Sequence, residues 1–218
     1  MTLPGDPVDT NAILVLAQPV VDTFHAAVVD CGRAPPFKPV IRIATEPGPI
    51  RYESGAVVLV PYELLGDARR AAMERFGAIG TLGLSGREQY REVFNHLLVA
   101  HELGHWLQEA AQRPLNRWQA EYEANRIMVA FWRDHPAAPP AAATELRLAN
   151  FTAQAPGTPR PMPDDTGVSA EDYFNAHADE IERNPLAYAG FQKLMVRTAM
   201  AETPAPGFRE VVATAWPV

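Results

Sequence analysis

Two histidines stand at the end of an apolar helical stripe, and their position limits how this chain can fold. The stripe advances by three or four residues at a time, so its members share one helix face: Phe94, Leu97, Leu98, His101 and His105. The positions before the histidines predict an inward face, whereas Gln108, the next position, is polar. Two buried imidazoles without partners cost free energy. The fold is therefore expected to bring a partner group to both histidines.

A divalent metal ion is the partner that this spacing favours. Residues four apart on a helix project the same way, so His101 and His105 can bind one ion. Imidazole is a good zinc ligand, and catalytic zinc sites use three protein ligands plus water. Glu102 lies too far round the helix to join both histidines but close enough to reach the water, which suits a general base. The pattern predicts a Zn2+ site; the alternative is an accidental pair, one histidine buried and one exposed.

A third ligand is expected from the next helix, predicted over residues 118–134. Glu121 and Glu123 are the candidates, and we favour Glu121. Asn125 is one turn after Glu121, so it can face the same site and accept the free ring N–H of a liganding histidine. Gly104 would allow another element to approach the histidine-bearing helix closely, at a helix-propensity cost of about 1 kcal/mol relative to Ala.

The segment H-E-L-G-H followed by E-Y-E-A-N resembles the gluzincin branch of zinc metallopeptidases. The resemblance covers residues 94–134 and implies zinc ligands at His101, His105 and Glu121, with Glu102 as base. It also implies a supporting role for Asn125, where many members carry Asp. Unlike some members of this branch, the sequence is expected to hold no membrane-spanning helix and no basic helix-turn-helix.

Gluzincins often stabilise the reaction's oxyanion with a Tyr, His or Arg from the C-terminal part. Tyr173 and His177 are one helical turn apart and are expected to face together, so we assign them this role. Tyr188 is a further candidate in the same region. The alternative is that Tyr173 belongs to the core and His177 to the surface.

The order of elements predicts an α+β fold in one domain spanning residues 1–218, and the resemblance implies that this fold is zincin-like. A small N-terminal sheet or hairpin (within 1–92) is expected to pack on the active-site helix, which the glutamate-bearing helix follows (93–135). A mostly irregular Pro-rich segment (136–168) and a mainly helical part (169–218) complete the chain. The predicted strands are 39–44, 49–53 and 56–61. The predicted helices are 13–30, 62–76, 85–112, 118–134, 169–180 and 185–202.

Charge and cysteine content exclude several classes of protein. The net charge is −7 and no Lys/Arg-rich run occurs, which argues against a nucleic-acid groove and against binding to anionic membranes. The single cysteine, Cys31, allows no intramolecular disulfide. No signal-peptide pattern is visible, and the apolar runs are shorter than a membrane span. A cytoplasmic location is therefore expected.

The function that these features predict is zinc-dependent hydrolysis of peptide bonds in a peptide or protein substrate. One alternative is a zincin-fold metal-binding protein with a regulatory role, whose cleft is capped by the Pro-rich segment or the C-terminal tail. A second alternative is a structural protein that binds no metal.

Overall fold

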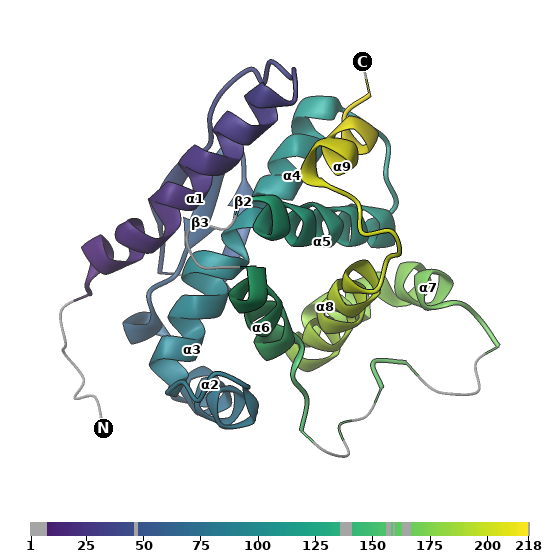
Figure 1. The fold of residues 1–218 in the computed structure, drawn as a ribbon. Coiled ribbons are helices and arrows are strands. Elements are labelled where there is room, and N and C mark those ends of the chain that lie inside the picture. Colours follow the sequence, from purple (N-terminus) through teal and green to yellow (C-terminus); the bar gives the residue numbers. More distant parts are fainter. Residues whose placement is uncertain are drawn as a thin grey trace.

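The computed structural model describes residues 8–45, 48–135, 141–155, 158, 160–162 and 167–217. It is a mixed α and β structure, mainly helical with one small sheet, as the sequence predicted at this coarse level (Figure 1). The helices are α1 (Thr10–Asp30), α2 (Asp67–Ile79), α3 (Gly86–Glu92), α4 (Val99–Ala111), α5 (Arg117–Asp134), α6 (Ala141–Thr152), α7 (Ala170–Arg183), α8 (Pro185–Met200) and α9 (Phe208–Ala215). The strands are β1 (Val40–Ile43), β2 (Ile50–Glu53) and β3 (Ala56–Leu59).

The sheet has the order β1-β3-β2, so β2 lies at one edge. Strand β3 pairs in parallel with β1 and antiparallel with β2, and every one of its residues is buried. The predicted hairpin between β2 and β3 is confirmed. Its turn residues, Ser54 and Gly55, both have positive φ (46° and 82°), which suits a two-residue hairpin turn. The edge strand β2 contacts α4, the helix that carries both histidines.

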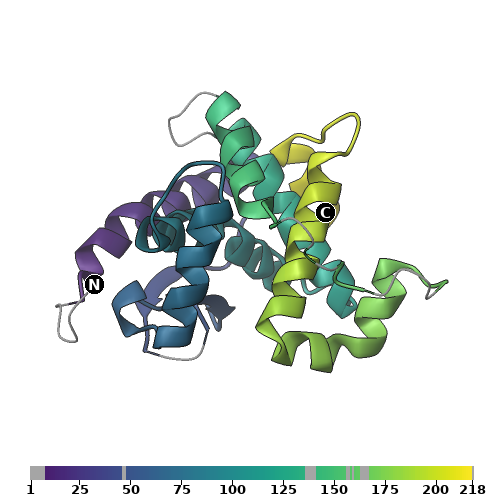
Figure 2. The same ribbon diagram turned by 90° about the horizontal axis from the view of Figure 1, so that it is seen from below.

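Helices α4 and α5 form the centre of the molecule. Helix α1 and the sheet lie on one side of this pair, and α7 and α8 lie on the other (Figure 1; Figure 2). The main core cluster draws residues from α1, β3, α4, α5, α6, α8 and α9. Gly104 of α4 faces Ala124 of α5, and a Cβ at Gly104 would lie 2.9 Å from the Ala124 Cα. The predicted close approach at Gly104 is therefore confirmed.

The predicted continuous helix over residues 85–112 is interrupted. Ser85 caps α3 through a capping box with Glu88, so a helix does begin where the sequence predicted. A π-helical turn, η2 (Val93–Leu97), then separates α3 from α4, with the Leu98 N–H donating to the Val93 carbonyl at 2.9 Å. Such a turn inserts one extra residue, which rotates the preceding stripe relative to the histidines. Leu97 and His101 are accordingly buried, whereas Phe94 is only partly buried.

Two other predicted regions differ from the structure. Residues 62–76 hold a short 3-10 turn, Tyr62–Leu64, and α2 begins only at Asp67, because Leu65 and Gly66 are extended. The segment 136–168 was expected to be mostly irregular, but it contains the twelve-residue helix α6. Alanine is the strongest helix former, and burial of Leu148 and Phe151 in the main core stabilises the helix.

Helix α1 is long and apolar enough to cross a membrane by length and composition, with a mean hydropathy of 1.7 over its most apolar window. The expectation that no apolar stretch reaches this length is therefore wrong for α1. Seven of its residues, from Ile13 to Val28, are buried in the fold. A core helix and an N-terminal signal sequence can both meet this criterion.

His96 of the π turn is a buried, structural histidine. Its ring lies 4.7 Å from the Trp132 ring between centroids, and its Nδ1 has no hydrogen-bond partner. Burial, together with the charge of Arg147, lowers the pKa of His96 to about 4. The folded protein therefore keeps this imidazole neutral at pH values where the unfolded chain would protonate it.

Replacing Gly104 with Ala should destabilise the protein. The added methyl group meets backbone of α5, and such overpacking costs about 1–3 kcal/mol, more than the gain of about 1 kcal/mol in helix propensity. Urea unfolding followed by circular dichroism, in the presence of a chelator, measures the change. A Gly104→Ala variant as stable as the wild type would show that α4 and α5 separate without cost.

Replacing His96 with Phe should weaken the pH dependence of stability while keeping the ring contact with Trp132. The folded pKa of His96 lies below the unfolded value, so its contribution is present above pH 6.5 and is lost as the pH falls toward 4. Between pH 7.5 and 5 this loss is about 2 kcal/mol. Urea unfolding of metal-free protein at both pH values should show a smaller fall for His96→Phe. Equal falls in the two proteins would contradict this account.

Candidate metal centre

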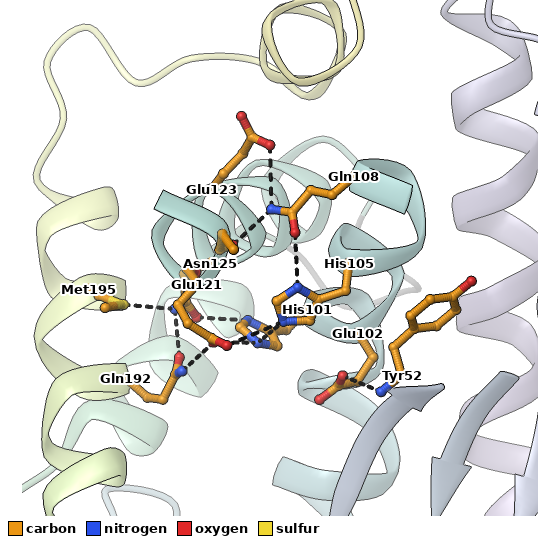
Figure 3. Close-up of polar contacts among 11 residues, drawn as sticks. Tyr52, His101, Glu102, His105, Gln108, Glu121, Glu123, Asn125, Gln192 and Met195 are labelled. Atoms are coloured by element: carbon orange, nitrogen blue, oxygen red, sulfur yellow. Dashed lines mark hydrogen bonds and ion pairs between the residues drawn. The ribbon is translucent and has the colours of Figure 1, made fainter. Parts of the chain in front are cut away.

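His101, His105 and Glu121 converge on one point between α4 and α5 (Figure 3). The two histidine Nε2 atoms are 3.2 Å apart. The Glu121 carboxylate lies 3.4 Å from the His101 Nε2 and 3.7 Å from the His105 Nε2. One ligand atom from each residue falls within 4.8 Å of the others. These three residues could therefore hold a single metal ion.

The close approach of α4 and α5 brings these side chains together. His101 and His105 share a face of α4 because they are one turn apart, and Gly104 lies between them on the helix. Gly104 contacts Ala124, which is three residues after Glu121 on α5. Helix α5 begins with a capping box formed by Asn116 and Gln119, which places Glu121 in its second turn.

Asn125 fixes the proton position on His101. The Asn125 Nδ2 donates to the backbone carbonyl of Glu121 at 2.9 Å, and this carbonyl can only accept. The Asn125 Oδ1 therefore faces the His101 Nδ1 at 3.1 Å and accepts its proton. In this assignment the His101 Nε2 carries a lone pair directed at the centre.

Gln108 orients His105 in the same way. The Gln108 Nε2 donates to the carbonyl of Ala120 at 2.8 Å, so its Oε1 is the atom 3.0 Å from the His105 Nδ1. The His105 Nδ1 donates this bond, and its Nε2 also carries a lone pair toward the centre. The sequence had identified Gln108 only as the polar position where the stripe leaves the core.

The centre therefore places two imidazole lone pairs and a carboxylate against one another. Burial raises the pKa of Glu121, but hydrogen bonding to His101 and the two histidine charges outweigh it, so the pKa is lowered. Burial lowers the pKa of His101, but its hydrogen bond to Glu121 and the charges of Glu102 and Glu121 raise it overall. Either a proton on a histidine or a bound metal ion can supply the positive charge that these three groups favour. A donor set of two imidazoles and one carboxylate suits zinc.

Glu102 follows the first histidine and is buried at 7% exposure. Its Oε2 accepts the backbone N–H of Tyr52, on the edge strand β2, at 2.7 Å. Burial raises the pKa of Glu102, and the neighbouring charges of His101 and His105 oppose that rise. Figure 3 shows this carboxylate beside β2, apart from the Glu121 carboxylate. The sequence did not reveal that β2 would position it.

Glu123, the alternative third ligand, faces a different set of partners. Its Oε2 accepts from the Arg113 guanidinium at 2.8 Å, and its Oε1 lies 3.4 Å from the Gln108 Nε2. Arg113 also donates to the carbonyls of Thr214 and Ala215 at the end of α9. Glu123 therefore contacts Gln108, which in turn hydrogen bonds to His105. Glu121, in contrast, lies directly against both histidines.

Tyr173 and His177 face together as expected, with ring centroids 4.5 Å apart. His177 is exposed on α7, and its Nδ1 lies 3.9 Å from Glu180. Tyr173 also stacks on Phe191, at 6.2 Å between centroids. These ring contacts lie around α7 and α8, and none of them involves His101, His105 or Glu121. Their assignment to the oxyanion stays a prediction.

Tyr188 of α8 is the tyrosine that the structure places beside the two glutamates. Its pKa is raised well above the ordinary value, first by burial and then by the charges of Glu121 and Glu102. The phenol therefore remains protonated and can donate a hydrogen bond. The sequence had named Tyr188 only as a further candidate.

Comparison of this chain with protein-family models, curated proteins and solved structures found no match. The chemistry of the centre is therefore inferred from its own geometry.

The two glutamates can be distinguished by isosteric variants. Glu121→Gln removes a charged ligand and should weaken zinc affinity by more than about 100-fold, since loss of a supporting partner alone costs about 10- to 100-fold. Glu123→Gln should change the affinity by less than about 10-fold, because Glu123 acts only through Gln108. Competition with a chromophoric chelator, using protein without a His-tag, measures both. The reverse ranking would make Glu123 the ligand.

Proposed function

We propose that this protein is a zinc-dependent hydrolase that cleaves peptide bonds, with a zincin-like fold. The observation that carries the proposal is the convergence of three acceptor groups in one place: the His101 Nε2, the His105 Nε2 and the Glu121 carboxylate. The orientation of Asn125 and Gln108 directs both imidazole lone pairs to that place. A metal ion supplies the positive charge that such a group needs.

The order of elements supports the zincin-like part of the proposal. A small sheet comes first, and its edge strand contacts the helix with the H-E-x-x-H pattern. The helix with the third ligand follows directly, and a mainly helical part completes the chain.

The residues around the centre fit a hydrolytic reaction. When bound, zinc would polarise the scissile carbonyl and make a water molecule more acidic. Glu102 takes the proton from the attacking water and transfers it to the leaving amine nitrogen. The Tyr52 N–H holds the Glu102 Oε2, which leaves the second carboxylate oxygen for this transfer. Tyr188 donates a hydrogen bond to the developing oxyanion.

The edge strand β2 favours an extended peptide as substrate. Strand β2 pairs with β3 on one side only and lies next to Glu102. An extended peptide can add through main-chain hydrogen bonds to the part of this edge that the bond between the Tyr52 N–H and Glu102 leaves open, which would bring its carbonyls near the base.

Replacing Glu102 with Gln should separate metal binding from catalysis. The variant should retain one zinc ion per chain, because Glu102 is not a ligand, and should lose at least about 100-fold in kcat, the usual contribution of a general base. Cleavage of a quenched fluorescent peptide library and metal content by atomic emission provide the two measurements.

Glu145→Gln on α6 is the matched control, since this glutamate pairs with Arg133 near the surface. It should keep both metal and activity. Hydrolysis by Glu102→Gln at the wild-type rate would refute the role of Glu102, and a zinc-loaded wild type that cleaves no peptide would refute the peptidase proposal.

A further inference from the structure

Gln192 of α8 contacts two residues of the candidate centre at once. Its Nε2 donates to the Glu121 Oε2 at 2.6 Å. Its Oε1 accepts from the Asn125 Nδ2 at 2.7 Å. The side chain is 7% exposed, so both bonds are shielded from water. Figure 3 shows Gln192 reaching from α8 to both residues.

We infer that Gln192 is a positioning residue of the centre, which holds the Glu121 carboxylate and the Asn125 amide in the orientations that metal binding needs. This inference rests on the proposed metal function. Gln192 does not itself lie among the three ligand groups. It acts through Glu121, a ligand, and through Asn125, which sets the His101 tautomer.

The carboxamide group is the chemistry that this position requires. One atom must donate to an ionised carboxylate while another accepts from an amide N–H, and a neutral carboxamide does both. An ionised Glu at this position would have no proton to donate to Glu121. An apolar side chain of similar size would leave buried polar atoms of Glu121 and Asn125 without these partners.

The backbone carbonyl of Glu121 determines which atom donates and which accepts in each of these hydrogen bonds. The Glu121 carbonyl accepts one proton of the Asn125 Nδ2, and the Gln192 Oε1 accepts the other. With both protons used, the Asn125 Oδ1 must face His101. Without Gln192, the second proton would have only the Met195 Sδ, a weak acceptor at 3.7 Å.

Helix α8 therefore borders the centre, together with α4 and α5. Tyr188 and Gln192 are one turn apart on α8 and therefore share a face of this helix, from which Gln192 reaches Glu121. Helix α8 packs on α5, the helix that carries Glu121 and Asn125. Correct docking of a helix some seventy residues later in the chain therefore sets the orientation of the third ligand.

Gln192→Met tests this inference, because methionine is similar in size, cannot donate to Glu121 and is only a weak acceptor for Asn125. Full-length, untagged protein is stripped of metal, and its zinc affinity is measured by competition with a chromophoric chelator. The affinity should fall about 10- to 100-fold, the usual effect of removing an outer partner of a ligand. The visible absorption bands of cobalt-loaded protein should also shift, because the ligand geometry changes.

Gln89→Met is the matched control. Gln89 is a fully buried carboxamide of α3 that accepts a hydrogen bond from Asn150, so its loss should also lower stability. It lies outside the metal network, and its zinc affinity and cobalt spectrum should match those of the wild type. If the methionine variant does not fold, the zinc affinity and cobalt spectrum of Gln192→Leu are measured instead.

The outcomes separate this inference from the proposed function. A wild type that binds zinc, with a Gln192→Met variant of equal affinity and an unchanged cobalt spectrum, would overturn the role of Gln192 alone. An equal loss of affinity in Gln89→Met would also overturn it, since the effect would then be one of general stability. A wild type that binds neither zinc nor cobalt would overturn the metal centre and this inference together.

Discussion

The approach of α4 to α5 at Gly104 is the contact on which the rest of the centre depends. A Cβ at Gly104 would meet the backbone of Ala124, so no larger residue allows the two helices this separation. At this distance the Glu121 carboxylate reaches both histidine rings. A carboxylate held against two imidazoles favours a positive charge between them, and this electrostatic preference underlies the proposed metal chemistry of the site.

Carboxamide side chains give the centre its orientation. Asn125 directs His101, Gln108 directs His105, and Gln192 holds Glu121. Backbone carbonyls fix two of these amides, because such a carbonyl can accept a hydrogen bond but cannot donate one. The arrangement presents imidazole lone pairs instead of N–H groups to the centre, and it engages three helices from separate parts of the chain.

Departures from the predicted fold arose where tertiary packing outweighed local pattern. A π turn forms where a backbone N–H bonds to the carbonyl five residues earlier instead of four. The spacing of apolar residues around Phe94 and Leu97 does not predict such a change. Helix α6 follows prolines and alanines that suggested an irregular segment, yet burial of Leu148 and Phe151 against other helices stabilises it. The hairpin was predictable because its turn residues and strand pattern are local.

The sequence by itself determined the placement of His101 and His105 on one helix face and of Glu102 beside them, because spacing along a helix is a local property. It also left two glutamates on the next helix as candidates for a third metal ligand. Only the tertiary structure decided that Glu121 lies against the histidines while Glu123 pairs with Arg113. It also decided that β2 holds Glu102, and that Tyr188 and Gln192 lie near Glu121. Those contacts join residues distant in the chain, and which of them form depends on how whole helices pack.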